Sequence, residues 1–600
     1  YNADEIERQI SISTSLMHCE WKNCKLNILD TPGYSDFIGE VIGALRVTDT
    51  GIVVVNSVSG VEVGTENAWK IANQGGVSTV FFVNRMDKEH ADFNQALESA
   101  RERFGTKVIP VHLAVNAGED FDSFVDLTKM KLVQYETNGS GKFTSSDIPD
   151  DLKSTAEEMH EKLVEMAAES DDTLLEKFFE EGSLSEEDLK KGLKAGIANL
   201  AIFPVLCGSA EKNIGIQHLM DFVANYGTAP VDRPAEKATK VGKEEEKECP
   251  CKPDAPVSIL VFKTVSETHL GELSFLKVVS GKVTGGDEVM NTSRKVTEKI
   301  GQIYLMNGKN RQELGNLSAG DIGATVKLRD THTGNTLSDK RDPVVLKGIE
   351  FPNPVIRIAV EPKAKGDEEK ISTGLHTLHE QDPTFIASYD PELGQTIIAG
   401  QGELHLDIVV RRLKEKFGVD VNLVEPKIPY RETIKGKAEA QGKYKKQSGG
   451  RGQYGDTWIR VEPLPRGAGF EFVDAIVGGV IPSKFIPAVE KGIKEIMEEG
   501  VMAGYVVVDV KVTLYDGSYH NVDSSEMAFK VAGSMGFKKA FKDAKPVLLE
   551  PIYEVEVTVP EEFMGDVMGD ISSRRGKIQG MDSEGPFQIV KAKIPLAELY

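Results

Sequence analysis

Short apolar runs alternate with helical patterns over the first part of the chain. The runs are largely continuous in apolar residues, which is typical of strands covered on both faces of a sheet. They lie at residues 26–29, 52–55 and 80–83, with apolar residues at helical spacing over 39–47 and 66–74. This order predicts a doubly wound α/β domain, which we place at residues 1–236.

Helical periodicity with many carboxylates dominates residues 95–200. We expect a solvated acidic helical insertion that interrupts the α/β domain before its last strand. Residues 237–254 are lysine, glutamate and proline with no apolar period, which predicts a linker. Apolar or alternating stretches separated by glycines follow over 255–345 and predict a β-barrel.

Three further domains are expected towards the C-terminus. Residues 352–430 follow a βαββαβ order, and 550–600 begin the same order, so both predict ferredoxin-like domains, the second incomplete. Residues 431–549 predict a separate α+β domain, in which Ser483 and Ser524 are expected to cap two helices. The whole chain is therefore expected to be a multidomain α/β and α+β protein.

Length, charge and cysteine content limit the class of protein. Six hundred residues are too many for one core, and the net charge of -23 argues against a general nucleic-acid binder while allowing local basic patches. The five cysteines suggest no paired framework, which favours a reducing, cytoplasmic compartment. Cys249-Pro-Cys251 is either a pair of metal ligands or, as is usual in a charged linker, incidental. No apolar run reaches the ~18 residues of a membrane span, so no membrane contact is expected.

Candidate chemistry begins at the stretch Asp30-Thr31-Pro32-Gly33-Tyr34, directly after the first predicted strand. A carboxylate at a strand end can hold Mg²⁺ through water. A glycine three residues later lets its backbone N–H approach a terminal phosphate oxygen. A single Asp-x-x-Gly sequence is more often an ordinary turn, so this stretch needs support from elsewhere in the chain.

Two other strand ends supply that support. Asn84-Arg85-Met86-Asp87 follows one apolar run, and Gly208-Ser209-Ala210 follows another at residues 202–206. The Asp87 carboxylate can accept two N–H groups from the edge of guanine, whereas adenine presents the wrong donors. A backbone N–H of the second loop can reach the base carbonyl. Because the carboxyl ends of parallel strands meet at one sheet edge, these loops predict a guanine-nucleotide site rather than three unrelated turns.

In this order the motifs resemble those of translational GTPases, and the rest of the chain narrows the resemblance to the elongation factor G family. Residues 400–406 are similar to that family's third-domain motif, and 472–482 and 514–520 to its fourth domain. Release-factor GTPases of the same superfamily lack this fourth domain and fit poorly. The resemblance covers essentially the whole chain.

The family implies five domains, GTP or GDP with Mg²⁺, and work on the ribosome, where it contacts both subunits and rRNA. It moves tRNA and mRNA by one codon in the decoding region, and it is a monomer off the ribosome. The implied metal ligands are Ser11 and Asp30. The implied nucleotide-binding residues are Asp30, Thr31, Pro32, Gly33, Tyr34, Asn84, Arg85, Met86, Asp87, Gly208, Ser209 and Ala210.

By the same resemblance, loops at 448–455 and around His520 form a tip that enters the decoding region. Lysines there make a basic stretch on an acidic protein, glycines let the backbone approach a sugar-phosphate chain, and aromatic rings can stack on bases. The alternative is a flexible, solvated loop. The expected RNA-binding residues are Lys445, Lys446, Gly449, Gly450, Arg451, Gln453, Tyr454 and His520.

Three positions depart from the family, and all surround the phosphate. Tyr34 stands where the family has the histidine that positions the attacking water. A phenol with a pKa of ~10 cannot simply replace imidazole, and loss of such a group removes roughly 10²–10⁴ in rate, unless Tyr34 orients water in its own way. Gln9-Ile10-Ser11 replaces Gly-Ile-Thr, which keeps a hydroxyl but loses the freedom of glycine. Arg85 replaces a lysine that packs along the nucleotide.

A phosphate-cradling loop, GxxxxGK followed by Ser or Thr, does not occur before the first strand. Either this loop lies upstream of Tyr1 or the site has no such phosphate-binding loop. We expect an upstream segment, because residues 1–15 resemble the middle of a switch segment. The second ferredoxin-like unit likewise stops before its last helix and strand, so both ends of the chain are expected to be cut.

Together these features predict an elongation factor G paralogue that binds the ribosome and promotes translocation with weak or absent GTP hydrolysis. One alternative is a non-catalytic ribosome-binding factor for protection or hibernation, which altered tip loops would favour. Another is a ribosome-recycling factor, which the sequence barely separates from a translocase.

Overall fold

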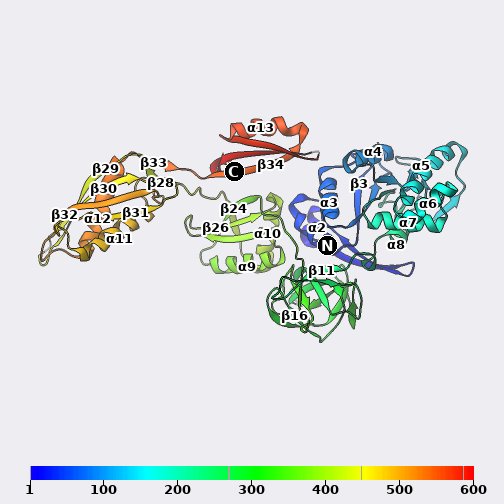
Figure 1. Ribbon diagram of the computed structural model, residues 1–600, viewed down its shortest axis with the longest axis horizontal. Helices are drawn as coiled ribbons and strands as arrows, with labels where there is room; N and C mark the ends of the chain where they lie inside the picture. The colour runs from blue at the N-terminus through cyan, green and yellow to red at the C-terminus, as the bar shows by residue number, and fades with distance from the viewer. Residues whose placement is uncertain (1, 268–270, 448, 586) are drawn as a thin grey trace. The chain divides into compact units, whose positions relative to one another are not determined.

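The computed structural model describes residues 2–267, 271–447, 449–585 and 587–600. They form two compact units, one of residues 1–388 with 396–424 and one of residues 389–395 with 425–600. Figure 1 follows the chain by colour from blue to red, and each unit is described on its own below. No helix among the described residues is long and apolar enough to cross a membrane.

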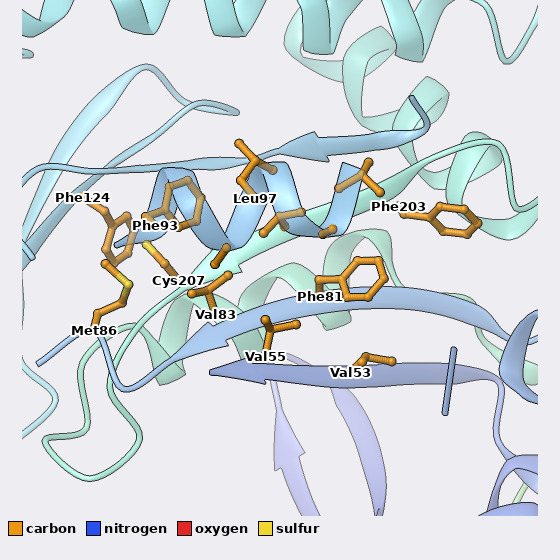
Figure 2. Close-up of a cluster of buried hydrophobic side chains, with 14 of the residues drawn as sticks. Val53, Val55, Phe81, Val83, Met86, Phe93, Leu97, Phe124, Phe203 and Cys207 are labelled. Carbon is orange, nitrogen blue, oxygen red and sulfur yellow. The ribbon is translucent and has the colours of Figure 1, made fainter. Parts of the chain in front are cut away.

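A parallel sheet in the order β3-β4-β10-β5 forms the centre of the first domain. Its core packs large apolar side chains of α4 against the sheet, with Phe81, Val83, Leu97 and Phe203 all buried (Figure 2). The strands are β3 (Thr50–Asn56), β4 (Ser78–Asn84), β5 (Val108–Pro110) and β10 (Phe203–Cys207), and the helices are α1 (Ala3–Arg8), α2 (Ile38–Val47), α3 (Val63–Gln74), α4 (Phe93–Phe104) and α8 (Ile216–Tyr226).

The strand expected at residues 26–29 exists, but not as part of this parallel sheet. It is β2 (Cys24–Asp30), and it pairs antiparallel with β1 (Ser15–Trp21) as a two-stranded hairpin. The polar side chains explain the difference. The Lys25 ammonium and the Asn27 amide donate to Asp321 at 2.8 and 2.9 Å, so the strand has a polar face.

Apart from the end of α4, the region expected as a helical insertion over 95–200 is helical only in its second half. Its first residues belong to α4 and β5 of the main domain, and an antiparallel sheet in the order β6-β7-β8-β9 follows. These strands have three to five residues, which is too short for an alternating strand pattern to be told apart from a helical pattern in the sequence. The inserted elements are β6 (His112–Ala114), β7 (Ser123–Asp126), β8 (Lys131–Tyr135), β9 (Phe143–Ser146), α5 (Asp150–Ala168), α6 (Asp172–Glu181) and α7 (Glu186–Ala198).

The expected linker at 237–254 is not irregular. It contains β11 (Glu236–Lys240) and β12 (Glu246–Cys249), which pair as a hairpin, and β11 also pairs with β23 (Val344–Leu346). Only Ala238 and Cys249 of the hairpin are buried hydrophobic residues, so its largely charged sequence shows no apolar strand pattern.

The barrel expected over 255–345 is built on an eight-stranded antiparallel sheet in the order β17-β16-β22-β13-β14-β21-β18-β19, beside a β15-β20 pair. Its strands are β13 (Ser258–Glu267), β14 (Gly271–Ser280), β15 (Lys282–Thr284), β16 (Glu288–Asn291), β17 (Val296–Lys299), β18 (Ile303–Asn307), β19 (Asn310–Leu314), β20 (Asn316–Ser318), β21 (Ile322–Val326) and β22 (Thr336–Ser338).

The third domain has the strand order β25-β26-β24-β27 with two helices, which is the ferredoxin-like arrangement that the sequence predicts. Leu375, Phe385, Ile398 and Leu413 form the centre of its core. Its elements are β24 (Ile356–Pro362), α9 (Glu368–Gln381), β25 (Ile386–Asp390), β26 (Gln395–Gly400), α10 (Glu403–Phe417) and β27 (Val421–Val424).

In the second unit, a sheet in the order β29-β30-β32-β31 packs against α11 and α12, with a β28-β33 pair at its base. The helix caps differ from the prediction: α11 begins after a short 3₁₀ turn at Ser483, and Ser525 rather than Ser524 caps α12 by accepting from Ala528 N. The elements are β28 (Arg431–Ile434), β29 (Ala438–Lys446), β30 (Gln453–Pro463), β31 (Phe470–Asp474), α11 (Ile486–Glu499), β32 (Val510–Ser518), α12 (Glu526–Asp543) and β33 (Pro546–Leu549).

The last residues form an antiparallel sheet in the order β34-β36-β35, packed on one helix. This order matches the first three strands of a ferredoxin-like unit. Its elements are β34 (Ile552–Pro560), α13 (Met564–Ser573), β35 (Lys577–Glu584) and β36 (Phe587–Pro595).

A buried carboxylate fixes the loop after α11. Glu432 on β28 is 1% exposed and accepts from the backbone N–H groups of Val501, Met502 and Ala503 at 2.9, 2.8 and 2.7 Å, and from Tyr505 at 3.3 Å. Burial alone would raise the pKa of Glu432, but these donors outweigh it and the pKa lies below its usual value.

We therefore predict that Glu432→Gln lowers the local opening free energy of residues 501–505 by about 2 kcal/mol, measured by amide hydrogen exchange. Because the folded pKa is lowered, the stabilisation is present above the unfolded pKa and is lost as pH falls through the folded value. The gap between native and variant should therefore shrink in acid. Glu498→Gln, at an exposed position of α11, is the control; equal effects of both variants would contradict the prediction.

Candidate functional site

The first candidate stretch follows β2. Asp30 ends this strand, and Thr31 to Tyr34 lead into a 3₁₀ turn at Ser35–Phe37. Tyr34 is 53% exposed, so its phenol faces outward rather than into a core. Gly33 is exposed, and a Cβ added to it would meet no heavy atom within 4 Å, so space is open beside its backbone.

Burial and a neighbouring charge govern Asp30. Burial raises the pKa of its carboxyl, and the negative charge of Glu5 raises it further. Glu5 lies on α1, and its carboxylate accepts from Ile12 N and Ser13 N at 2.9 and 3.0 Å. These bonds hold the segment that carries the half-buried Ser11. A cation beside Asp30 would relieve the cost of its ionisation, and carboxylate and hydroxyl oxygens such as those of Asp30 and Ser11 are ligand types that Mg²⁺ accepts.

The second stretch turns sharply after β4. Asn84 ends the strand, Arg85 is exposed with φ +64°, and Met86 is fully buried. The Ser57 hydroxyl donates to Arg85 O at 2.8 Å and fixes this left-handed turn. Asp87 follows and is only 5% exposed.

The third stretch follows β10 and is held tightly. The N–H of Gly208 donates to Val83 O at 3.0 Å, and Gly208 O accepts from Met86 N at 3.2 Å. A Cβ on Gly208 would lie 2.4 Å from Ile214 O and 2.7 Å from the Phe82 ring, so only glycine fits there. Figure 2 shows Met86, Val83 and Cys207 gathered at one end of the core, where the strands end.

Side chains complete this junction. Asn84 Oδ1 accepts from Ala210 N at 2.9 Å, so one backbone N–H of the predicted base-contacting loop is engaged by Asn84. The structure thus brings the second and third stretches together, as the strand order predicts. The contact between Asn84 and Ala210 has no signal in the sequence, because the two residues are far apart in the chain.

Asp87 has the electrostatics of a base-reading carboxylate. Burial opposes its ionisation, but a hydrogen bond with the Ser209 side chain and the nearby Lys88 and Lys212 lower its pKa. Among the described residues, its Oδ1 is one of few buried side-chain atoms without a hydrogen-bond partner. An ionised, buried acceptor without a partner fits the two N–H donors on the edge of guanine.

Gln9 departs from the usual backbone preference. It caps the C-terminal end of α1 with φ +54°, a left-handed conformation that glycine adopts at no steric cost. The resemblance described above places a family glycine at this position. Gln9 therefore holds, at some cost in backbone strain, a conformation that a glycine would adopt freely.

Within the first unit, the stretch after Tyr34 contacts the third domain. Asp36 Oδ2 accepts from His405 N at 3.2 Å at the start of α10, and a Cβ on Gly402 would lie 2.1 Å from this oxygen. On α1, Asp4 contacts Arg412 at 3.3 Å and Glu7 contacts Arg411 at 2.6 Å. No pattern in the sequence indicates these contacts. They link the Asp30 stretch and α1 to one helix of the third domain.

The expected RNA-binding residues lie at one end of the β29–β30 hairpin. Lys446 pairs with Gln453 and Lys445 with Tyr454 in register, and both lysines are exposed. Gly449, Gly450 and Arg451 follow in the exposed loop. Ser448, which the predicted loop includes, lies outside the described residues.

A second loop packs against this hairpin end. Arg451 Nε donates to Val522 O at 2.8 Å, and Gly452 N donates to Asp523 Oδ1 at 3.0 Å. The His520 side chain is 56% exposed, and its ring lies 6.4 Å from that of Tyr454. The structure therefore brings the two predicted segments together at one exposed basic and aromatic end.

Five family models match successive parts of the chain. The elongation factor Tu GTP-binding domain matches residues 1–229, elongation factor G domain 2 matches 256–340, domain III matches 351–425, domain IV matches 426–545 and the elongation factor G C-terminus matches 547–600. The first of these matches implies guanine-nucleotide binding.

A solved structure supports the same assignment over the full chain. The crystal structure of the protein ttk003000868 from Thermus thermophilus is similar to this chain at 34% identity, with a TM-score of 0.84. The similarity covers 100% of this chain and 87% of that one. With the strand-end loops and the order of domains, these matches show that the chain belongs to the elongation factor G family of translational GTPases.

Proposed function

We propose that this protein binds the ribosome with guanine nucleotide and Mg²⁺ and promotes movement of tRNA and mRNA, while hydrolysing GTP weakly or not at all. The proposal of weak hydrolysis rests on Tyr34, an exposed phenol at the position where the family places its water-positioning histidine. Positioning of water is most of what such a site adds beyond charge neutralisation.

The proposed roles combine the family resemblance with the contacts between the strand-end loops. Asp87, Asn84 and the Gly208–Ala210 loop read the base, with Thr31, Pro32 and Gly33 beside the phosphates and Arg85 along the nucleotide. Asp30 and Ser11 hold Mg²⁺, which would neutralise phosphate charge when bound. The nucleotide then acts mainly as a conformational ligand, since Asp36 and α1 connect this region to α10.

RNA contact is proposed for the hairpin end of the fourth domain. The chain carries a net charge of -23, yet Lys443, Lys445, Lys446 and Arg451 are all exposed there. Lys443 also lies 5.7 Å from the centre of the Tyr454 ring, so the site combines cations with an aromatic face. This composition suits tRNA, mRNA and rRNA in the decoding region.

The direct test is single-turnover GTP cleavage on ribosomes, run beside an assay of mRNA movement. We expect movement with slow cleavage, and we expect Tyr34→His to raise the cleavage rate by roughly 10²-fold or more. Tyr34→Phe, which keeps the ring but carries no imidazole, is the control. Native cleavage at the rate of an ordinary family member would contradict the weak-hydrolysis proposal. Ribosome splitting without mRNA movement would favour recycling.

Mg²⁺ binding should depend on pH through Asp30. Because burial and Glu5 raise the pKa of Asp30, protonation competes with the cation, so affinity falls as pH falls through this raised value. Glu5→Gln removes the neighbouring charge and keeps an acceptor for Ile12 N, so the pH midpoint of Mg²⁺ binding should move down. Glu7→Gln, on the exposed side of α1, should leave it in place. Titration of Mg²⁺ in the presence of GDP across pH measures both, and equal midpoints would refute the assignment of Asp30.

Lysines at the hairpin end should supply salt-dependent RNA affinity. Removing two phosphate contacts by Lys445→Ala with Lys446→Ala should reduce the slope of log affinity against log salt by about 1.4. Lys437→Ala is the matched control, because its ammonium already pairs with Glu462 at 2.5 Å. Ribosome binding at several salt concentrations gives the slope, and an unchanged slope in the double variant would exclude these lysines.

A further inference from the structure

The edge of the parallel sheet changes partner just before the Gly208 loop. β5 pairs with β10 as far as Pro110 opposite Val205, and Val111 N still donates to Val205 O at 2.9 Å. The chain then leaves as β6 and pairs with β7 of the insertion. Among the strand pairs of the described residues, none joins the insertion to the last residue of β10.

One histidine supplies an acceptor instead. The N–H of Cys207, the last residue of β10, donates to the Nδ1 atom of His112 at 3.3 Å. His112 is the first residue of β6. Its side chain therefore supplies the acceptor for the Cys207 N–H that the next backbone carbonyl of β5 would have supplied if β5 had continued along β10. Cys207 is fully buried, and a buried N–H that loses its acceptor is costly.

The surroundings keep the ring in the form that can accept. His112 is 3% exposed and stacks on Phe124, with ring centres 4.0 Å apart and planes 17° apart. Burial lowers the pKa of His112 to about 3, against the opposing charge of Asp126, so the imidazole is neutral in ordinary buffers. A neutral ring can leave Nδ1 unprotonated, which an acceptor requires.

The bond acts at a sensitive place. The residue after Cys207 is Gly208, whose N–H donates to Val83 O and whose carbonyl accepts from Met86 N. Its surroundings leave no room for a Cβ. Ala210 holds Asn84, and Ser209 contacts Asp87. A shift of Cys207 therefore moves both loops that face the base.

We propose that His112 of the inserted sheet is a positioning residue for guanine recognition, acting through the Cys207 N–H on the Gly208–Ala210 loop. The inference deepens the proposed function, because it assumes that this loop reads guanine. It gives the insertion a role in nucleotide selectivity and not only in packing.

Side-chain geometry provides a sharp set of variants. The Oδ1 atom of asparagine can take the place of Nδ1, whereas the amide of glutamine lies one methylene farther out. His112→Asn should therefore behave as the native chain, while His112→Gln and His112→Phe should lose the bond. His218→Phe is the control, since His218 lies in the same buried aromatic cluster but bonds Tyr135, with Nδ1 2.6 Å from the hydroxyl oxygen.

The experiment measures affinities of the full chain for GDP, IDP and ADP. Loss of one buried hydrogen bond predicts a roughly tenfold weaker GDP affinity in His112→Gln and His112→Phe. The preference for GDP over the other two nucleotides should fall, with rescue in His112→Asn and no change in His218→Phe. Parallel weakening for all three nucleotides, or no loss in His112→Gln, would overturn the proposal.

A second measurement needs no nucleotide. Amide hydrogen exchange at Cys207 to Ala210 should speed up in His112→Gln and His112→Phe and stay slow in His112→Asn. Unchanged exchange would overturn the positioning role. Native chain that bound no guanine nucleotide would instead remove the proposed function, and the exchange result would still decide whether His112 holds the loop.

Discussion

The structure of the candidate nucleotide site depends on one glycine backbone. The N–H of Gly208 donates to Val83 O near the end of β4, and the Gly208 carbonyl accepts from Met86 N, just beyond that strand. No side chain fits at the Gly208 Cα. These bonds fix the spacing between the loop that carries Asp87 and the loop that carries Ser209. This spacing brings the Ser209 hydroxyl to Asp87, which, together with the nearby Lys88 and Lys212, favours the ionised form of this buried carboxylate. The site is thus set by backbone geometry first and by side-chain chemistry second.

The same logic extends to the third domain of the first unit. The start of α10 has backbone N–H groups that need acceptors, and Asp36, just after the Asp30 stretch, accepts from one of them. The glycine at Gly402 makes this approach possible, because a side chain there would occupy the position of the carboxylate. Ion pairs between α1 and α10 add contacts farther along the same helix. A ligand that moves the backbone near Asp30 or Ser11 would therefore also strain or shift these contacts with α10.

The sequence predicts the domains with central sheets well and the pairing of short polar strands poorly. The convergence of Asn84–Asp87 with Gly208–Ala210 follows from parallel strand order, and the ferredoxin-like order of the third domain follows from its pattern. The hairpin of β1 with β2, the inserted sheet and the hairpin at 236–249 were not predicted. Their strands are short or carry polar and charged side chains, so they lack the apolar pattern that marks a strand, although each pairs with its neighbour in the chain. His112 has no local signal at all, since its function depends on a bond to Cys207, ninety-five positions away.

The central claim is that Asp87, held by the Gly208 loop, reads guanine through two N–H groups. The most direct measurement compares the affinities of the native chain and Asp87→Asn for GDP and XDP. Xanthine carries a carbonyl where guanine carries an amino group, so an asparagine amide can donate to it while a carboxylate cannot. The account predicts that the native chain prefers GDP and that Asp87→Asn reverses the preference. Equal loss of both nucleotides, or a native chain indifferent to the base, would contradict it.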